Sequence, residues 1–186
     1  MQVDYSKYYW QDGLVRLRKG GLEDWGFLYA SMFDSPARVL YDLEIDLPHD
    51  EEAAKASWAS FLEGDKSGKS FVFMIESHDG ELLGSAYLFG IDERHGHFSA
   101  GITLAPEHRG KGYGSSALRL VFDYAFNERR MHKYNGFIIE GNAASEALLK
   151  KFGCVFEGRR RENIYHQGRY IDELHYGLTF DEFNSL

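Results

Sequence analysis

Three glycines at alternate positions stand out among the residues that could do chemistry. They lie in Arg109-Gly110-Lys111-Gly112-Tyr113-Gly114, between an expected strand and an expected helix. Glycines leave the backbone uncovered, so several N–H groups can point at one anion, and the helix that follows adds the positive end of its dipole. The segment therefore predicts a diphosphate-binding loop, with the Arg109 and Lys111 side chains as further donors.

Two better-known phosphate loops do not fit this segment. A Walker A loop needs G-x-x-x-x-G-K-[ST], and Lys111 is not followed by Ser or Thr after such spacing. A dinucleotide-binding fingerprint needs G-x-G-x-x-G, whereas the sixth position counted from Gly110 is Ser115. A nucleotide-binding oxidoreductase is therefore disfavoured, and a merely flexible loop does not account for the alternate glycine spacing.

The elements that must position this loop alternate between strands and helices. Apolar periodicity predicts four helices, over 23–32, after Pro48, over 115–129 and over 143–152. Asp50 is the expected N-cap of the second. It predicts strands over 14–18, 71–76, 82–91, 97–104 and 135–140, and a last hairpin that turns at Gln167-Gly168. The order β-α-α-β-β-β-α-β-α-β-β indicates one α/β domain around a single sheet.

Composition limits the class of protein. The 186 residues suit one domain, and no stretch approaches the roughly 20 apolar residues of a membrane span. The start is not typical of a signal peptide, and Cys154 is the single cysteine, so we expect a cytoplasmic protein without a disulfide or a metal site. A net charge of −8 argues against a general nucleic-acid binder.

Motifs spread along the chain share one resemblance. Arg109-x-x-Gly112-x-Gly114 follows Leu104-Ala105-Pro106-Glu107-His108, and Asn142-x-x-Ser145 comes after the next strand. Together they resemble the acetyl-coenzyme A (acetyl-CoA) site of the GNAT superfamily of N-acetyltransferases, whose loop reads Gln/Arg-x-x-Gly-x-Gly/Ala. Val15-Arg16-Leu17-Arg18 and Gly168-Arg169-Tyr170-Ile171-Asp172-Glu173-Leu174 resemble the branch that contains ribosomal-protein and spermidine N-acetyltransferases.

The resemblance implies an α/β (α+β) fold and a direct transfer reaction. We expect one GNAT-type domain over 1–186, with its core at about 14–178, built on a mixed, mostly antiparallel sheet of about seven strands. About four helices would flank it, and the sheet would splay between the fourth and fifth strands. The implied activity moves an acetyl group from acetyl-CoA to a primary amine in a ternary complex. The acceptor would be a polyamine or other small amine, or a protein N-terminus, and the enzyme a monomer or homodimer.

The resemblance also assigns cofactor contacts. The pantetheine arm would pair with the strand at Ile102 to Leu104, and a backbone N–H near Leu104 would polarise the thioester carbonyl. The loop from Arg109 to Gly114 would hold the diphosphate. Asn142 matches a family Asn that contacts the cofactor; a helix N-cap is the other interpretation, and both can hold at once.

Catalytic side chains are less determined. Leu149 stands where many relatives carry a Tyr that protonates the sulfur, and Ser145 is the candidate in its place; a hydroxyl bonded to its own helix is equally consistent. Ser99 stands where relatives often carry a Glu. The candidate bases are therefore His97, on the same strand face, and Glu162, near a Glu of the ribosomal-protein branch. A surface histidine and a solvated strand carboxylate are the competing interpretations.

The acceptor side is marked only by charge. Residues 1–100 carry 9 Lys and Arg against 18 Asp and Glu, with acids gathered around the first two expected helices at Asp42, Glu44, Asp46, Asp50, Glu51 and Glu52. In the family this region forms the acceptor wall, so these acids either attract a cationic amine or are ordinary solvated surface. A second class of function also stays open, a non-catalytic acyl-CoA-binding or sensing module, because Leu149 and Ser99 replace common catalytic residues.

Overall fold

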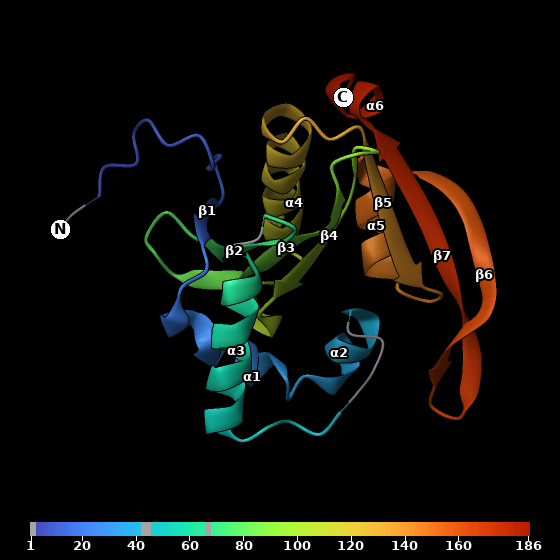
Figure 1. The fold of residues 1–186 in the computed structure, drawn as a ribbon, viewed down its shortest axis with the longest axis horizontal. Helices are drawn as coiled ribbons and strands as arrows, with labels where there is room; N and C mark the ends of the chain where they lie inside the picture. Colours follow the sequence, from blue (N-terminus) through green and yellow to red (C-terminus); the bar gives the residue numbers. More distant parts are fainter. Residues whose placement is uncertain (1–2, 42–45, 66–67) are drawn as a thin grey trace.

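A seven-stranded sheet with helices on both faces organises the molecule (Figure 1). The computed structural model describes residues 3–41, 46–65 and 68–186. The strands are β1 (Arg16–Lys19), β2 (Phe71–Glu76), β3 (Leu82–Asp92), β4 (His97–Leu104), β5 (Lys133–Ile139), β6 (Val155–His166) and β7 (Arg169–Thr179). The α-helices are α1 (Trp25–Ser31), α2 (Ser35–Tyr41), α3 (Glu51–Asp65), α4 (Tyr113–Asp123), α5 (Ala143–Lys151) and α6 (Phe180–Asn184).

The sheet opens in its middle. Its strand order is β1-β2-β3-β4-β5-β7-β6, and every neighbouring pair is antiparallel except β4 and β5. These two parallel strands pair only through His97–Phe98 and Lys133–Tyr134, while β4 stays paired with β3 as far as Leu104. Beyond Phe98 the strands diverge, each held by its outer neighbour. The predicted splay between the fourth and fifth strands is confirmed.

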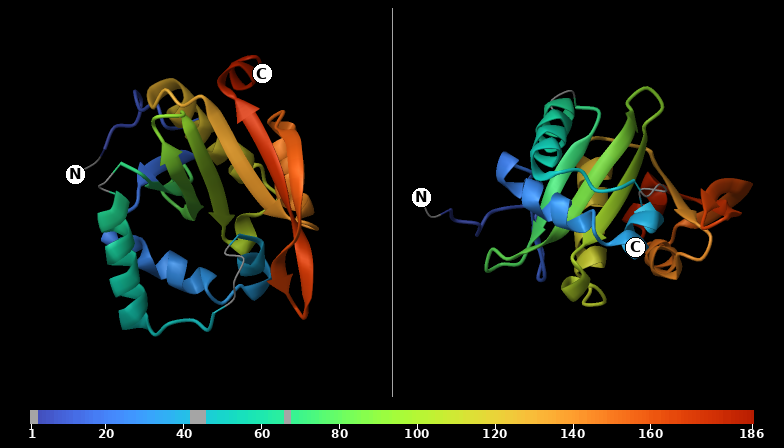
Figure 2. Two further views of the ribbon diagram at one scale, coloured as in Figure 1. Left: turned by 45° about the vertical axis from the view of Figure 1, so that its right-hand side comes forward. Right: turned by 90° about the horizontal axis from the view of Figure 1, so that it is seen from below.

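Alternation along β2 separates two cores. Val72 and Met74 pack with Trp58 of α3 on one face, whereas Ile75 belongs to the cluster that α4 covers on the other. In Figure 2 the right-hand view shows α3 and α4 on opposite sides of the sheet. The predicted apolar stripe is buried in full, at Leu118, Val121 and Phe122 of α4 and at Ala125 in the π-helical turn that follows it.

Two of the six α-helices are not predicted by the sequence pattern. Helix α2 begins at Ser35-Pro36, where the proline indicates a junction, and its seven residues are too few to show a helical period. Helix α6 begins with a capping box, in which the Thr179 N–H donates to Glu182 Oε2 at 2.8 Å. That Thr-x-x-Glu signal is readable in the sequence. Among the described residues, no helix combines the length and apolarity needed to cross a membrane.

A buried ion-pair network ties the first helices to the sheet. Arg18 of β1 donates to both carboxylate oxygens of Asp24, at 2.7 and 2.6 Å, and to Glu76 Oε1 at 2.5 Å. Burial raises the pKa of Asp24, but hydrogen bonds from Arg18 and from the Gly21 N–H outweigh it, and the net pKa is lowered. Trp58 of α3 donates to the Gly21 carbonyl at 2.8 Å, so α1 and α3 are held at one end of the sheet.

Candidate active site

The glycine loop adopts a backbone that side chains disfavour. Gly110 has φ 74° and Gly112 has φ 89°, both in the left-handed region, and Gly112 is the N-cap of α4. Gly114 lies inside the helix, where an added β-carbon would make an ordinary contact, 3.5 Å from Leu104 Cδ1. Two of the three glycines are therefore required by conformation.

The N-terminus of α4 presents unpaired donors. The first hydrogen bond of the helix runs from the Ser116 N–H to the Gly112 carbonyl at 3.1 Å. The N–H groups of residues 113–115 precede that bond, and no side chain caps them. With the helix dipole behind them, these N–H groups suit the anion site that the sequence predicts.

Arg109 makes contacts that the sequence does not indicate. Its Nε donates to the Leu104 carbonyl at 3.0 Å, and a terminal nitrogen donates to Asp34 Oδ2 at 2.6 Å. The Arg109 hydrogen bond lowers the pKa of the Asp34 carboxyl. Because Asp34 lies between α1 and α2, this pair links the loop to the helices on the far side of the splay. Lys111 is exposed to solvent.

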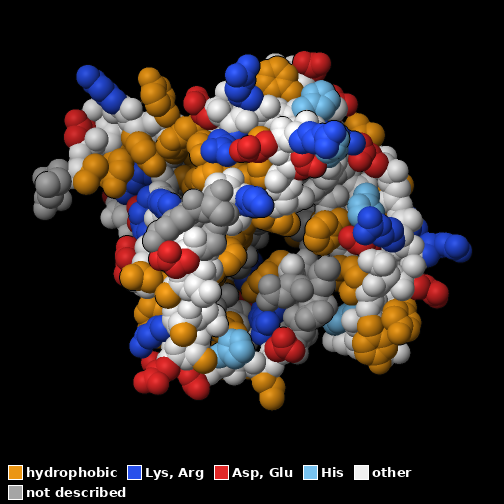
Figure 3. Space-filling view, in the orientation of Figure 1, with side chains coloured by type: hydrophobic (Ala, Val, Ile, Leu, Met, Phe, Trp, Pro, Cys, Tyr) orange, Lys and Arg blue, Asp and Glu red, His pale blue; other side chains and the backbone are white. Residues whose placement is uncertain are grey.

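A cavity of about 730 Å³ passes through the splay. Ile102 of β4 and Leu118 of α4 line it on one face of the sheet, and side chains of α1, α2 and α3 line it on the other. At the fork of the two strands the Ser99 hydroxyl donates to the Asn135 carbonyl at 2.7 Å. Figure 3, in the orientation of Figure 1, shows a hollow near the middle of the molecule with hydrophobic side chains around its opening.

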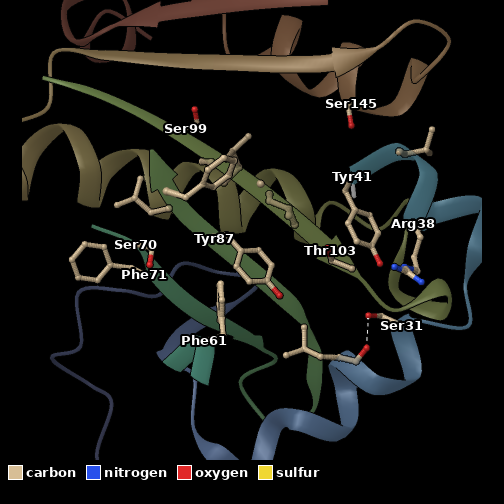
Figure 4. Close-up of a pocket in the computed structure, with 18 of the residues that line it drawn as sticks. Ser31, Arg38, Tyr41, Phe61, Ser70, Phe71, Tyr87, Ser99, Thr103 and Ser145 are labelled. Atoms are coloured by element: carbon tan, nitrogen blue, oxygen red, sulfur yellow. Dashed lines mark hydrogen bonds between the residues drawn. The ribbon is translucent and has the colours of Figure 1, made fainter. Parts of the chain in front are cut away.

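Ser145 is the predicted catalytic side chain that lies at this cavity. It lines the wall from the start of α5, and Figure 4 shows its hydroxyl pointing inward. Its backbone N–H donates to Asn142 Oδ1 at 3.1 Å, so the N-cap interpretation of Asn142 is confirmed. Buried Leu149 lines the same wall, one turn further along the helix.

The two predicted bases lie elsewhere. His97 sits at the closed end of β4, where β4 and β5 are still paired, because the strands separate only after Phe98. Glu162 is exposed in an irregular part of β6, with φ 52°, and its N–H donates to Asp172 Oδ1 at 2.8 Å. Neither side chain is among the described residues that line the cavity. Sequence places both on strands but cannot say where the sheet opens.

The described part of the acidic segment also stays outside the cavity. Asp46, Asp50, Glu51 and Glu52 are exposed and do not line it, while Asp42 and Glu44 lie outside the described residues. Asp50 instead caps α3, as predicted, accepting a hydrogen bond from the Ala53 N–H at 2.8 Å. Within the described ranges, no three His, Cys, Asp or Glu side chains are grouped so as to hold a metal ion.

Aromatic side chains that the sequence analysis does not single out line the cavity on the side of α1–α3. Trp25 and Tyr29 come from α1, Phe61 from α3, and Tyr87 and Phe89 from β3. Alternation along β3 could have placed Tyr87 and Phe89 on one face of the strand, and helical spacing could have placed Trp25 and Tyr29 on one face of α1. Which elements face one another across the cavity could not be read from the sequence, because that depends on the packing of α1–α3 on the sheet.

Known proteins share both sequence and fold with this chain. Residues 15–155 match the family described as the acetyltransferase (GNAT) domain. The chain is 31% identical over 106 residues to a putative ribosomal N-acetyltransferase, YdaF, of Bacillus subtilis, covering 57% of this chain and 58% of that protein. It is 31% identical over 100 residues to a spermidine N(1)-acetyltransferase of Vibrio cholerae, covering 54% and 58%. The matched segment thus spans somewhat more than half the length of these relatives.

A solved structure agrees over almost the whole fold. A spermidine N-acetyltransferase from Vibrio cholerae, crystallised with CoA and spermine, superposes with a TM-score of 0.83 at 21% identity, covering 93% of this chain and 99% of that one. At this identity the likeness concerns the fold. Because the family match extends over most of the chain, and the splayed sheet and left-handed glycine loop agree with it, the chain belongs to the GNAT family of acetyltransferases.

Proposed function

We propose that this protein transfers an acetyl group from acetyl-CoA to a primary amine, directly, in a ternary complex of enzyme, donor and acceptor. The observation that carries the proposal is the juxtaposition of two features. A left-handed glycine loop presents uncapped N–H groups at the start of α4, and a cavity runs beside it through the gap between β4 and β5. The first suits the diphosphate of acetyl-CoA and the second its thioester arm.

The donor would lie along the inner edge of β4. The diphosphate is assigned to the loop from Arg109 to Gly114, and Asn142, which holds the first turn of α5, is a further cofactor contact. Beyond Phe98 the inner edge of β4 has no partner strand, so the pantetheine amides can pair with residues Ile102 to Leu104 as an added strand would. The thioester would then lie inside the cavity, next to a backbone N–H near Leu104 that would polarise its carbonyl.

With the donor and acceptor bound in this way, the side chains need only assist the proton transfers. A neutral amine nitrogen attacks the thioester carbon, the C–N bond forms, the C–S bond breaks and CoA leaves as a thiolate. A thiol has a pKa of roughly 8.5, so the thiolate departs with little protonation, and the Ser145 hydroxyl assists by donating a hydrogen bond to the sulfur. The ammonium proton leaves to water or to His49, the imidazole among the described lining residues. Replacing His49 by Gln tests this route: an unchanged acid limb of the kcat/KM profile rules it out.

A second candidate function, the sensing of acyl-CoA without turnover, is supported by the residues at two positions. Buried Leu149 lines the cavity where many relatives carry the acidic Tyr, and the Ser99 hydroxyl is tied to the Asn135 carbonyl where relatives often carry a Glu. A protein that binds acyl-CoA and senses it without turnover would tolerate both. The loop and cavity support donor binding in either case, so turnover is what separates the two functions.

Thiol release tests the proposal. CoA release from acetyl-CoA is followed with a thiol reagent against a panel of polyamines, simple alkylamines, arylalkylamines and short peptides with free N-termini. Acetylated product detected by mass spectrometry, with rates above hydrolysis, supports the enzyme. Binding of CoA, measured by thermal shift, without turnover of any amine supports the sensor and contradicts the proposed activity.

A further inference from the structure

Five large apolar side chains on the cavity wall remain open to solvent. They are Leu40, Tyr41, Phe61, Phe89 and Phe137, with exposed fractions between 37% and 44%. Side chains of this type are ordinarily buried, and apolar surface that stays exposed inside a concave site is typical of ligand-binding surface. They come from four elements, α2, α3, β3 and β5, so the wall is a property of the assembled fold.

This apolar wall lies beside the strand along which the donor arm would run. Phe89 pairs with Ser99 at the fork of the strands, and its ring lies over Gly101, with Cε1 3.9 Å from the position of an added β-carbon. Phe137 lines the cavity from β5, across the splay. On the opposite side Phe61 packs edge-to-face on Tyr87, with ring centroids 6.0 Å apart. An acceptor that reaches the sulfur from this side passes between these rings.

The charges on the described part of the wall do not match a polycation. Among the described lining residues there is no Asp or Glu, and those that can carry charge are Arg38 and His49. Arg38 donates to the Asp46 carbonyl at 2.9 Å. Each ammonium group taken out of water needs a carboxylate or several acceptors to offset its lost hydration. The described lining supplies no carboxylate, and its hydroxyl and amide groups are scattered among apolar side chains. A single ammonium at the reacting end is different, because aromatic faces attract it before it loses its proton.

We propose that the acceptor is a primary monoamine carried on an apolar alkyl or arylalkyl body, which the wall of Leu40, Tyr41, Phe61, Phe89 and Phe137 covers. This inference rests on the proposed acetyl transfer and names its substrate class. The amine nitrogen forms the C–N bond, the C–S bond breaks, and the proton lost by the amine is balanced by the proton that CoA regains. The apolar body takes no part in the chemistry and serves to hold the nitrogen in line.

An isosteric pair of amines tests the proposal directly. Pentylamine and 1,4-diaminobutane have the same number of heavy atoms and differ in one end, a methyl group against an ammonium. We expect kcat/KM for pentylamine to exceed that for the diamine by about tenfold or more, and to rise about fourfold per methylene from propylamine to pentylamine. 2-Phenylethylamine and phenylalaninamide extend the series. The first represents a free small amine and the second an apolar N-terminal residue, so their relative rates distinguish the two kinds of acceptor.

The failures of the two proposals are distinguishable. If 1,4-diaminobutane or spermidine matches or exceeds pentylamine, the monoamine inference is overturned while acetyl transfer stands. If CoA binds and no amine of either kind is acetylated, the proposed function itself is overturned, and the inference with it.

A charge introduced into the wall gives an independent readout. In Phe61→Glu a carboxylate replaces an exposed ring on α3, and we expect the ratio of kcat/KM for 1,4-diaminobutane to that for pentylamine to rise about tenfold. Tyr165→Glu, at an exposed ring on β6 outside the cavity, is the matched control and leaves the ratio unchanged. Phe61→Leu keeps the wild-type preference, and a CoA-dependent thermal shift verifies that each variant is folded. An unchanged ratio in Phe61→Glu contradicts the wall as the acceptor site.

Discussion

Replacing Gly112 by alanine tests whether the left-handed turn before α4 presents the N–H groups to acetyl-CoA. Gly112 has φ 89° and caps the helix, and a β-carbon added there would meet only Leu14 Cδ1, at 3.6 Å. That distance is ordinary van der Waals contact. The cost of the substitution is therefore conformational rather than steric, which makes its magnitude simple to bound.

The expected loss follows from this strain. An L-residue held in the left-handed region costs about 1–2 kcal/mol relative to glycine. In a domain of this size 1 kcal/mol corresponds to roughly 2–4 °C, so the melting temperature of Gly112→Ala should fall by about 2–8 °C. If the turn relaxes instead, the N–H groups move and charge-assisted hydrogen bonds to the diphosphate are lost, at about 1.5–3 kcal/mol each. CoA affinity would then fall by about tenfold or more.

Gly114→Ala is the matched control, because the site is helical and an added methyl group fits beside Leu104. We expect its free energy of unfolding to be unchanged or raised by up to about 1 kcal/mol, with CoA affinity kept. Gly112→Asn should recover part of the loss, since Asn tolerates the left-handed region. Urea unfolding measures stability, and calorimetric titration with CoA measures affinity.

The comparison has one decisive outcome. Equal losses of stability in Gly112→Ala and Gly114→Ala would mean that the backbone conformation of Gly112 is not what distinguishes the two positions. A Gly112→Ala protein with wild-type stability and affinity would refute the reasoning altogether, because neither strain nor displacement of the donors would then be present.

Four further predictions concern other parts of the structure. Arg18→Ala should lower the free energy of unfolding by about 3–5 kcal/mol at neutral pH, since it leaves the buried Asp24 and Glu76 carboxylates without this partner; a loss under 1 kcal/mol in urea unfolding contradicts the network. Because the native pKa of Asp24 is lowered, its stabilisation is present above the ordinary carboxyl pKa and is lost as pH falls through the lowered value, so the wild type should lose more stability than Asp24→Asn below about pH 4. Burial raises the pKa of Cys154 to about 12, so a thiol reagent should modify it only on unfolding, and rapid labelling of the native protein refutes this. Ser145→Ala should lower kcat less than about tenfold, with the deficit shrinking as pH approaches the thiol pKa, whereas a pH-independent deficit argues for a structural role.

The fold was predictable because its signals are local. Apolar patterns mark β1 to β5, Gln167-Gly168 marks the turn of the β6–β7 hairpin, and the loop, with Leu118, Val121 and Phe122 after it, marks α4. The exceptions are α2 and α6, which are too short to show a period. Even the splay follows from the family resemblance and not from any pattern within β4 or β5.

The active site was predictable only where its residues are close in sequence. The loop residues lie at the start of α4 and Asn142-x-x-Ser145 at the start of α5, where the spacing predicts them, since each set belongs to one strand-to-helix turn. His97 and Glu162 are different, because their distance from the cavity depends on where the sheet opens and on how β6 bends. Neither the opening of the sheet nor the bend of β6 can be read from the sequence of one strand.

The sequence by itself indicated the proposed donor site of this protein. A diphosphate needs several N–H groups from consecutive residues, and glycines at alternate positions before a helix encode that arrangement locally. The proposed acceptor site could be recognised only in the tertiary structure. Its apolar wall joins α2, α3, β3 and β5, and the link between Arg109 and Asp34 spans 75 positions of the chain. Such contacts arise from packing between distant elements, where hydrophobic burial selects the arrangement and no local spacing records it.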